Sequence, residues 1–105
     1  MATPTQDLAP LGWGDDAVAL VHHDLIGPEV DALRTRLRSI IDRGHRVVVV
    51  DLRDVDEIDR AGAGVLAGAA HRLEDMGGRL FLRDTSTRVV DALTAAGVVP
   101  PVNIL

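Results

Sequence analysis

The densest group of chemically capable side chains in this 105-residue sequence follows its most apolar run. It comprises five carboxylates, Asp51, Asp54, Asp56, Glu57 and Asp59. Clustered carboxylates can bind hard divalent cations, but the spacing lacks the ligand order and the mid-loop glycine of an EF-hand. A solvated acidic loop, which can also meet arginines on another protein, is the favoured interpretation. We therefore expect no metal ion and no other cofactor.

The remaining residue types exclude several kinds of catalysis. The chain has no cysteine, and each of its 11 lysine-or-arginine positions is arginine, which rules out thiolate nucleophiles and lysine Schiff bases. A receiver-type phosphotransfer site at Asp51 would also need a lysine. Neither serine, Ser39 or Ser86, lies in a local serine–histidine–aspartate arrangement. We expect a protein that is not an enzyme.

Length, charge and hydropathy further limit the class of protein to which this chain can belong. The length suits one domain with its own core, and a net charge of −5 disfavours nucleic-acid binding through a broad basic face. No run approaches the ~20 apolar residues that span a bilayer, and no basic-then-apolar leader opens the chain. We expect a cytoplasmic protein without direct membrane insertion. The polar residues 1–12 are predicted to be a flexible tail before a domain over 13–105.

Apolar periodicity predicts strands that alternate with helices. The expected strands cover 17–21, 47–50 with an extension to Leu52, 79–82 and 102–105. The expected helices run from Pro28 to Gly44, over 61–74, and from a cap at Thr85 or Ser86 to Gly97. The β-branched run 47–50 is typical of a strand buried on both faces. This order predicts a single α/β domain with a mixed, mainly parallel β-sheet and helices packed on it.

The segment between the acidic loop and the second helix is the candidate site. Asp59 suits the N-cap position, because its carboxylate can accept hydrogen bonds from the free N–H groups of the first turn. The small residues 61–64 leave that turn nearly bare, so another protein can approach it closely. The residues predicted to bind a partner are Asp56, Glu57, Asp59, Arg60, Ala61, Gly62, Ala63 and Gly64.

An ordered set of motifs resembles the core of STAS domains, the anti-sigma-factor-antagonist family. It comprises an apolar strand ending in Asp51-Leu52, a loop ending in Ile58-Asp59, a small-residue turn with Gly62, and Gly64-Val65-Leu66. Gly77-Gly78-Arg79-Leu80 and the ending Ala96-Gly97-Val98 extend the resemblance from about Ala17 to Gly97. The resemblance implies a STAS-like fold and a role in transcription regulation by partner switching. It implies docking on an anti-sigma factor, a serine-kinase-like protein.

The sequence departs from that family's pattern at one position. The antagonists' turn usually reads Asp-Ser-Ser-Gly or Asp-Ser-Thr-Gly, and a phosphoryl group on the residue before the glycine blocks docking through charge and bulk. Aligned on Asp59 and Gly62, that position is Ala61, which has no hydroxyl, and Arg60 precedes it. Docking without phosphorylation at the usual site is therefore expected. Thr85, Ser86 or Thr87 could serve as a substitute phosphorylation site, but helix capping and turn formation explain these hydroxyl residues with fewer assumptions.

Three further interpretations stay open. The Asp59-Arg60-Ala61-Gly62 turn is also similar to the STAS branch that serves as a small cytoplasmic subunit of lipid-transport ABC systems. The apolar residues Val98, Val99, Val102, Ile104 and Leu105 are expected on an uncovered surface, where a partner or a second copy can cover them. Arg34 and Arg38 lie one helical turn apart and could form a basic patch, although a solvated helix face is favoured.

Overall fold

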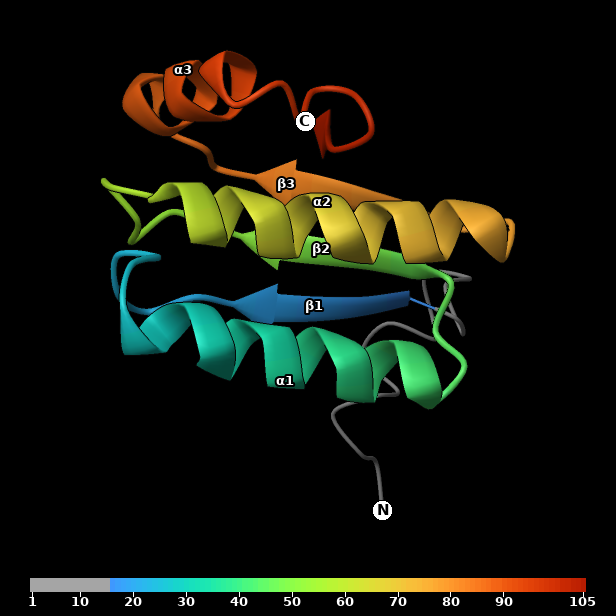
Figure 1. The fold of residues 1–105 in the computed structure, drawn as a ribbon. Coiled ribbons are helices and arrows are strands. Elements are labelled where there is room, and N and C mark those ends of the chain that lie inside the picture. Colours follow the sequence, from blue (N-terminus) through green and yellow to red (C-terminus); the bar gives the residue numbers. More distant parts are fainter. Residues whose placement is uncertain (1–15) are drawn as a thin grey trace.

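Four strands form a parallel sheet in the order β1-β2-β3-β4, in a computed structural model that describes residues 16–105 (Figure 1). The strands are β1 (Asp16–Leu20), β2 (Val47–Asp51), β3 (Arg79–Arg83) and β4 (Asn103–Ile104). Each lies within about one residue of its predicted start. The predicted tail over 1–12 and the first residues of the predicted domain, 13–15, lie outside the described residues.

Three helices alternate with these strands in residues 16–105: α1 (Pro28–Asp42), α2 (Arg60–Asp75) and α3 (Thr87–Ala95). The predicted α/β domain is thus confirmed, with a sheet that is parallel throughout the described part. Ser86, not Thr85, caps α3, because its hydroxyl accepts a hydrogen bond from Val89 N at 3.2 Å. No helix in this part of the chain combines the length and apolar character needed to cross a membrane.

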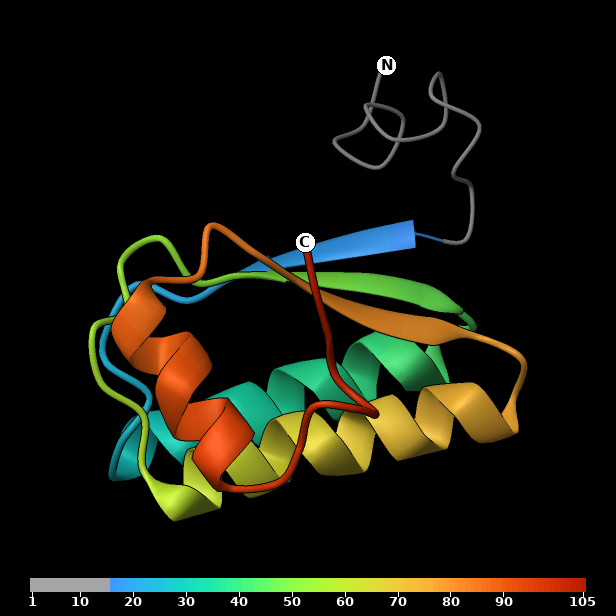
Figure 2. The same cartoon turned by 90° about the horizontal axis from the view of Figure 1, so that it is seen from above.

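All three helices lie on one face of the sheet (Figure 2). Residues of neighbouring strands that share a row, such as Ala19, Val50 and Leu82, point toward these helices and are completely buried. Val47 and Val49 point to the other face and are only partly buried, so the expectation of a strand buried on both faces is wrong. The physical reason is the connectivity: strands in sequential order with crossovers of the same hand place every helix on the same side.

The C-terminal segment packs into the core. Val98 and Val102 are 9% and 1% exposed, and Val102 N donates to Val98 O at 3.0 Å as the chain turns back toward the sheet. Leu105 N then donates to Leu82 O at 2.9 Å, and among the five apolar residues of this end only Leu105 is exposed. The expectation of an uncovered apolar end is therefore wrong, and with it goes the basis for self-association through this segment.

Gly78 provides a test of how closely the strands approach one another. A β-carbon at this position would lie 2.1 Å from Arg46 O, a backbone atom that already accepts from Arg79 N. We expect Gly78→Ala to lower the free energy of unfolding by more than about 2 kcal/mol, measured by urea denaturation. The control is Gly68→Ala in α2, where an added β-carbon meets nothing within 4 Å and should stabilise by ~0.5–1 kcal/mol. Equal midpoints for the two variants would contradict the packing described.

Candidate docking site

Asp59 defines the beginning of α2. Its backbone is extended (φ −93°, ψ 176°), and its carboxylate Oδ1 accepts from Gly62 N at 2.7 Å, as predicted for an N-cap. The second oxygen, Oδ2, accepts a longer hydrogen bond of 3.4 Å from Gly27 N, directly before α1. One carboxylate therefore joins the starts of two helices.

The acidic loop before Asp59 is held by the connection between β1 and α1. Leu25 N donates to Glu57 O at 2.9 Å, and Asp59 N donates to Leu25 O at 3.2 Å. The side chain of Asp24 accepts from the backbone N–H groups of Asp56 and Glu57, at 2.8 and 3.2 Å. The loop is therefore fixed by a segment about 30 residues earlier in the chain, and it presents the carboxylates of Asp56 and Glu57 to solvent.

The first turn of α2 divides into a buried and an exposed half. A β-carbon on Gly62 would lie 2.7 Å from Leu25 O, and Ala63 is only 3% exposed, so both face the interior. The expectation of an exposed contact residue is therefore wrong for Gly62, because helical periodicity turns it toward the core, whereas Ala63 presents only a small surface, in the hollow between α2 and α3. Arg60, Ala61 and Gly64 are exposed. We refer to Asp56, Glu57, Arg60, Ala61 and Gly64 as the exposed tip.

Within residues 16–105, Glu57 is the member of the exposed tip that forms an ion pair. Arg88, at the start of α3, donates to Glu57 Oε2 at 3.0 Å, and both side chains are more than half exposed. Such an exposed pair contributes little to stability. Both side chains can therefore leave it and bind charged groups of a partner at a low cost in free energy.

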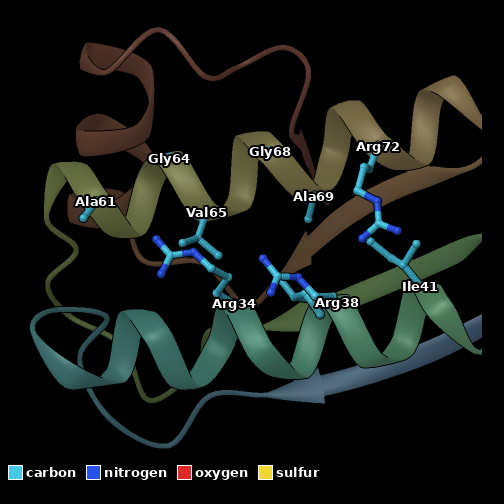
Figure 3. A pocket seen from close by; sticks show the side chains of 10 residues that line it. Arg34, Arg38, Ile41, Ala61, Gly64, Val65, Gly68, Ala69 and Arg72 are labelled. Atoms are coloured by element: carbon cyan, nitrogen blue, oxygen red, sulfur yellow. The ribbon is translucent and has the colours of Figure 1, made fainter.

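A groove of about 480 Å³ runs from Ala61 along the outer side of α2, between this helix and α1 (Figure 3). Its lining combines arginines with apolar and glycine residues: Arg34, Leu37, Arg38, Ile41, Ala61, Gly64, Val65, Gly68, Ala69 and Arg72. A second hollow of about 200 Å³ flanks the other side of the tip, between α2 and α3, and is lined mainly by alanines. Ala61 and Gly64 of the exposed tip line the first hollow, and Arg60 lines the second.

The carboxylates singled out from the sequence do not converge on one point. Asp51 is 1% exposed and lies at the end of β2, where Arg53 and Arg83 donate to its oxygens at 2.7–3.2 Å. Asp59 is used as a cap, and Asp54 is exposed. Within residues 16–105 no group of three or more potential ligands is gathered around a common centre.

Hydrogen bonds from Arg53 hold the pKa of the Asp51 carboxyl well below its usual range, and those from Arg83 act in the same direction. Burial alone would raise that pKa. The carboxylate in turn raises the pKa of the Arg53 guanidinium. Asp51 is consequently an ionised structural group, inaccessible to a substrate, and it ties the loop after β2 to β3.

Sequence reasoning missed Asp24, Arg88 and the pairing between Arg83 and Asp51. Each acts on a residue more than 30 positions away, so no local spacing signals the contact. Of the hydroxyl residues 85–87, Ser86 caps α3 and Thr87 is exposed. Thr85 Oγ1 is buried and has no hydrogen-bond partner among the described residues.

Comparison with known proteins places this geometry in a family. The profile described as "STAS domain" matches residues 16–104. A crystal structure of a candidate anti-sigma factor antagonist from Thermotoga maritima superposes with a TM-score of 0.78 at 19% identity, over 86% of this chain and 78% of that one. The structure of the Bacillus cell fate determinant SpoIIAA in the phosphorylated form gives a TM-score of 0.67 at 20% identity, over 87% of this chain and 83% of that one.

The unphosphorylated anti-sigma factor antagonist SpoIIAA gives a TM-score of 0.66 at 20% identity, over 76% of this chain and 74% of that one. At these identities the likeness shows the fold. No curated protein matches the sequence closely enough to count as a relative.

Removing the cap at Asp59 tests how α2 is anchored. Asp59→Ala leaves Gly62 N and Gly27 N without their acceptor, so we expect a loss of ~1–2 kcal/mol in the free energy of unfolding. Asp59→Asn keeps an acceptor oxygen and should lose no more than a few tenths of a kcal/mol, measured by urea denaturation. Equal losses in both variants would mean that charge, not capping, holds the helix start.

The ion pair at Asp51 makes stability depend on pH. Because the folded-state pKa is lowered, its contribution is complete above the unfolded value of ~4 and is lost as pH falls toward the folded-state value. We expect Asp51→Asn to cost ~1–3 kcal/mol near neutral pH, discounted for the half-exposed arginines, and progressively less below pH ~4. Urea denaturation near neutral pH and below pH ~4 measures the free energy of unfolding of the variant and of wild type. Asp54→Asn, at an exposed position, is the control and should change little at either pH.

Proposed function

The chain belongs to the STAS domain family, and we propose that it is a non-catalytic regulatory module that docks in the cytoplasm on an anti-sigma factor or another serine-kinase-like protein. The resemblance to anti-sigma factor antagonists in fold supports the kind of partner. The accessibility of the exposed tip carries the proposal. Ala61 and Gly64 lie at the surface of the first turn of α2, with hollows on both sides.

The chemistry of the tip suits contact with another polypeptide. Ala61 and Gly64 place almost no side chain between the helix and a partner, so backbone and partner can approach closely. Asp56 and Glu57 stand beside them as exposed carboxylates, held in place by the backbone contacts to Asp24 and Leu25. These charges are suited to arginines or lysines on the partner and would fix the orientation of docking.

The absence of a hydroxyl at Ala61 makes docking constitutive. A phosphoryl group at this position would add a charge of about −1.5 to −2 to the contact surface, which is how such a switch releases a partner. Alanine cannot accept it. Arg60 adds a positive charge where the helix dipole is already positive, which costs ~0.3–1 kcal/mol and is recovered if the partner supplies an acidic group.

A second candidate is the small cytoplasmic STAS subunit of a lipid-transport ABC system. The observation that favours it is the turn Asp59-Arg60-Ala61-Gly62, whose third residue is exposed and lacks a hydroxyl. In this function the same tip would contact a transporter subunit in place of a kinase-like protein.

A charge placed at Ala61 tests the proposal. Ala61→Glu mimics the phosphorylated state, and it should not unfold the domain because an acidic side chain is favourable in the first turn of a helix. We expect it to weaken binding to a serine-kinase-like anti-sigma factor of the same genome by at least about tenfold, measured by calorimetry with purified proteins. His71→Glu, which adds the same charge at an exposed position farther along α2, is the control and should bind as wild type.

Restoring the hydroxyls gives an independent readout. With the captured kinase and ATP, Arg60→Ser combined with Ala61→Ser should become phosphorylated at residue 61, whereas wild type should not. Binding of no kinase-like protein by wild type, together with copurification of a permease and an ATPase, would favour the transporter function. Binding that is unaffected by Ala61→Glu would contradict docking through the tip in either function.

A further inference from the structure

The groove between α1 and α2 has an apolar floor and an arginine rim. Leu37, Ile41, Val65 and Ala69 form the floor and are each less than 10% exposed. Arg34, Arg38 and Arg72 are the charged residues of the lining, and no carboxylate belongs to it. The charged side chains that line the groove are thus all positive, in a chain whose net charge is −5, and the carboxylates that pair with two of them, Asp31 and Asp42, lie outside the lining. The groove is therefore complementary to an acidic occupant.

The arginines are arranged along both walls of the groove (Figure 3). Arg34 and Arg38 project from successive turns of α1 toward α2, and Arg72 projects from α2 toward α1. Arg34 pairs with Asp31 and Arg72 pairs with Asp42, yet both arginine side chains stay about half exposed, at 46% and 50%. For Arg38, no carboxylate partner is found among the described residues. Their N–H groups thus remain available to a ligand.

The glycines of the lining are not needed for packing among residues 16–105. A β-carbon added to Gly64 or Gly68 would meet no atom within 4 Å, and neither glycine has a positive φ. Each costs α2 ~0.5–1 kcal/mol relative to alanine. Within the described part of the chain they leave an open wall, which allows a backbone to lie close against α2.

We propose that this groove binds an acidic amphipathic helix of the partner protein. From Ala61 to Arg72 the α2 wall extends ~16 Å, about three helical turns, which is long for a small anion and suited to a helix laid into a groove. Apolar side chains of that helix contact the floor, and carboxylates one turn apart meet Arg34, Arg38 and Arg72. The proposal rests on the docking function above, because the groove begins at the exposed tip, and it specifies the chemistry of the partner.

A protein helix fits the observations better than an anionic membrane does. A membrane presents a plane of negative charge to the whole domain, whose own net charge is −5, whereas a helix meets only the groove. Asp31 and Asp42, 79% and 59% exposed, lie beside the arginines and would face such a plane. Both lie on α1 and neither belongs to the residues that line the groove.

The test uses the full chain and a synthetic amphipathic peptide as probe. The peptide carries leucines on one helical face and glutamates one turn apart beside them, and a matched peptide carries glutamine at each glutamate. We expect at least about tenfold tighter binding of the glutamate peptide by fluorescence anisotropy, with an advantage that decreases as salt is raised. The amide resonances of Gly64 and Gly68 should shift on titration.

Variants locate the binding in the groove. Arg38→Glu should remove the preference for the glutamate peptide, and Gly68→Leu should weaken binding of both peptides by filling open space. Arg43→Glu and His71→Leu change exposed residues outside the lining and should behave as wild type. A peptide with lysine in place of each glutamate should bind the double variant Arg34→Glu, Arg38→Glu more tightly than it binds wild type. This charge reversal keeps the test valid if Arg38→Glu alone lowers binding for another reason.

Equal binding of the two peptides by wild type overturns the proposal, as does binding that Gly68→Leu leaves unchanged. Attachment to phosphatidylserine vesicles that Arg38→Glu abolishes, without a preference between the peptides, overturns it in favour of a membrane surface. If the groove binds the acidic peptide but no kinase-like protein binds the chain, the groove proposal is supported and the proposed partner class is wrong. If a kinase-like protein binds Arg38→Glu and Gly68→Leu as tightly as wild type, only the groove proposal fails.

Discussion

The hydrogen bonds of Asp59 and Leu25 are the constraint on which the candidate site depends. Asp59 caps α2 through Gly62 N and reaches Gly27 N at the start of α1, while the backbone of Leu25 pairs with the loop on both sides of Ile58. These contacts bring the starts of two helices and the acidic loop to one end of the sheet. Gly62 is required because Leu25 O occupies the space of a β-carbon. The exposed tip is the outer side of this junction.

The one-sided sheet determines where a partner can approach. All three helices lie on the same face (Figures 1 and 2), and hollows lie between α1 and α2 and between α2 and α3. Charge is distributed unevenly over this side of the molecule, with carboxylates at the loop and arginines along the α1–α2 groove. Patches of opposite sign side by side favour one orientation of a docked protein over others. The charge pattern can therefore select the orientation of a docked protein even where the side chains are small.

The composition of α2 shows a balance between helix stability and access. Its buried side carries Val65, Leu66 and Leu73, which anchor the helix on the sheet. Its outer side carries Gly64 and Gly68, which lower the stability of the helix although a β-carbon at either position would meet no atom of the described residues within 4 Å. Core burial offsets that weakness, because most helical stability in a folded domain comes from tertiary packing. An open helix surface can thus be kept in a well-packed domain.

Local interactions made much of this structure predictable from the sequence alone. The strands follow apolar runs, Asp59 and Ser86 cap helices through N–H groups three residues ahead, and the STAS motifs are ordered along the chain. Helical periodicity also places Gly62 and Ala63 on the side of Leu66 and Ala70, but the tertiary structure alone decided that Leu25 O fills the space beside Gly62. It also decided that Asp24 holds the acidic loop, that Asp51 pairs with Arg83, and that Arg72 joins Arg34 and Arg38 at one groove. These groups lie 30 or more residues apart, and only the packing of helices on the sheet brings them together.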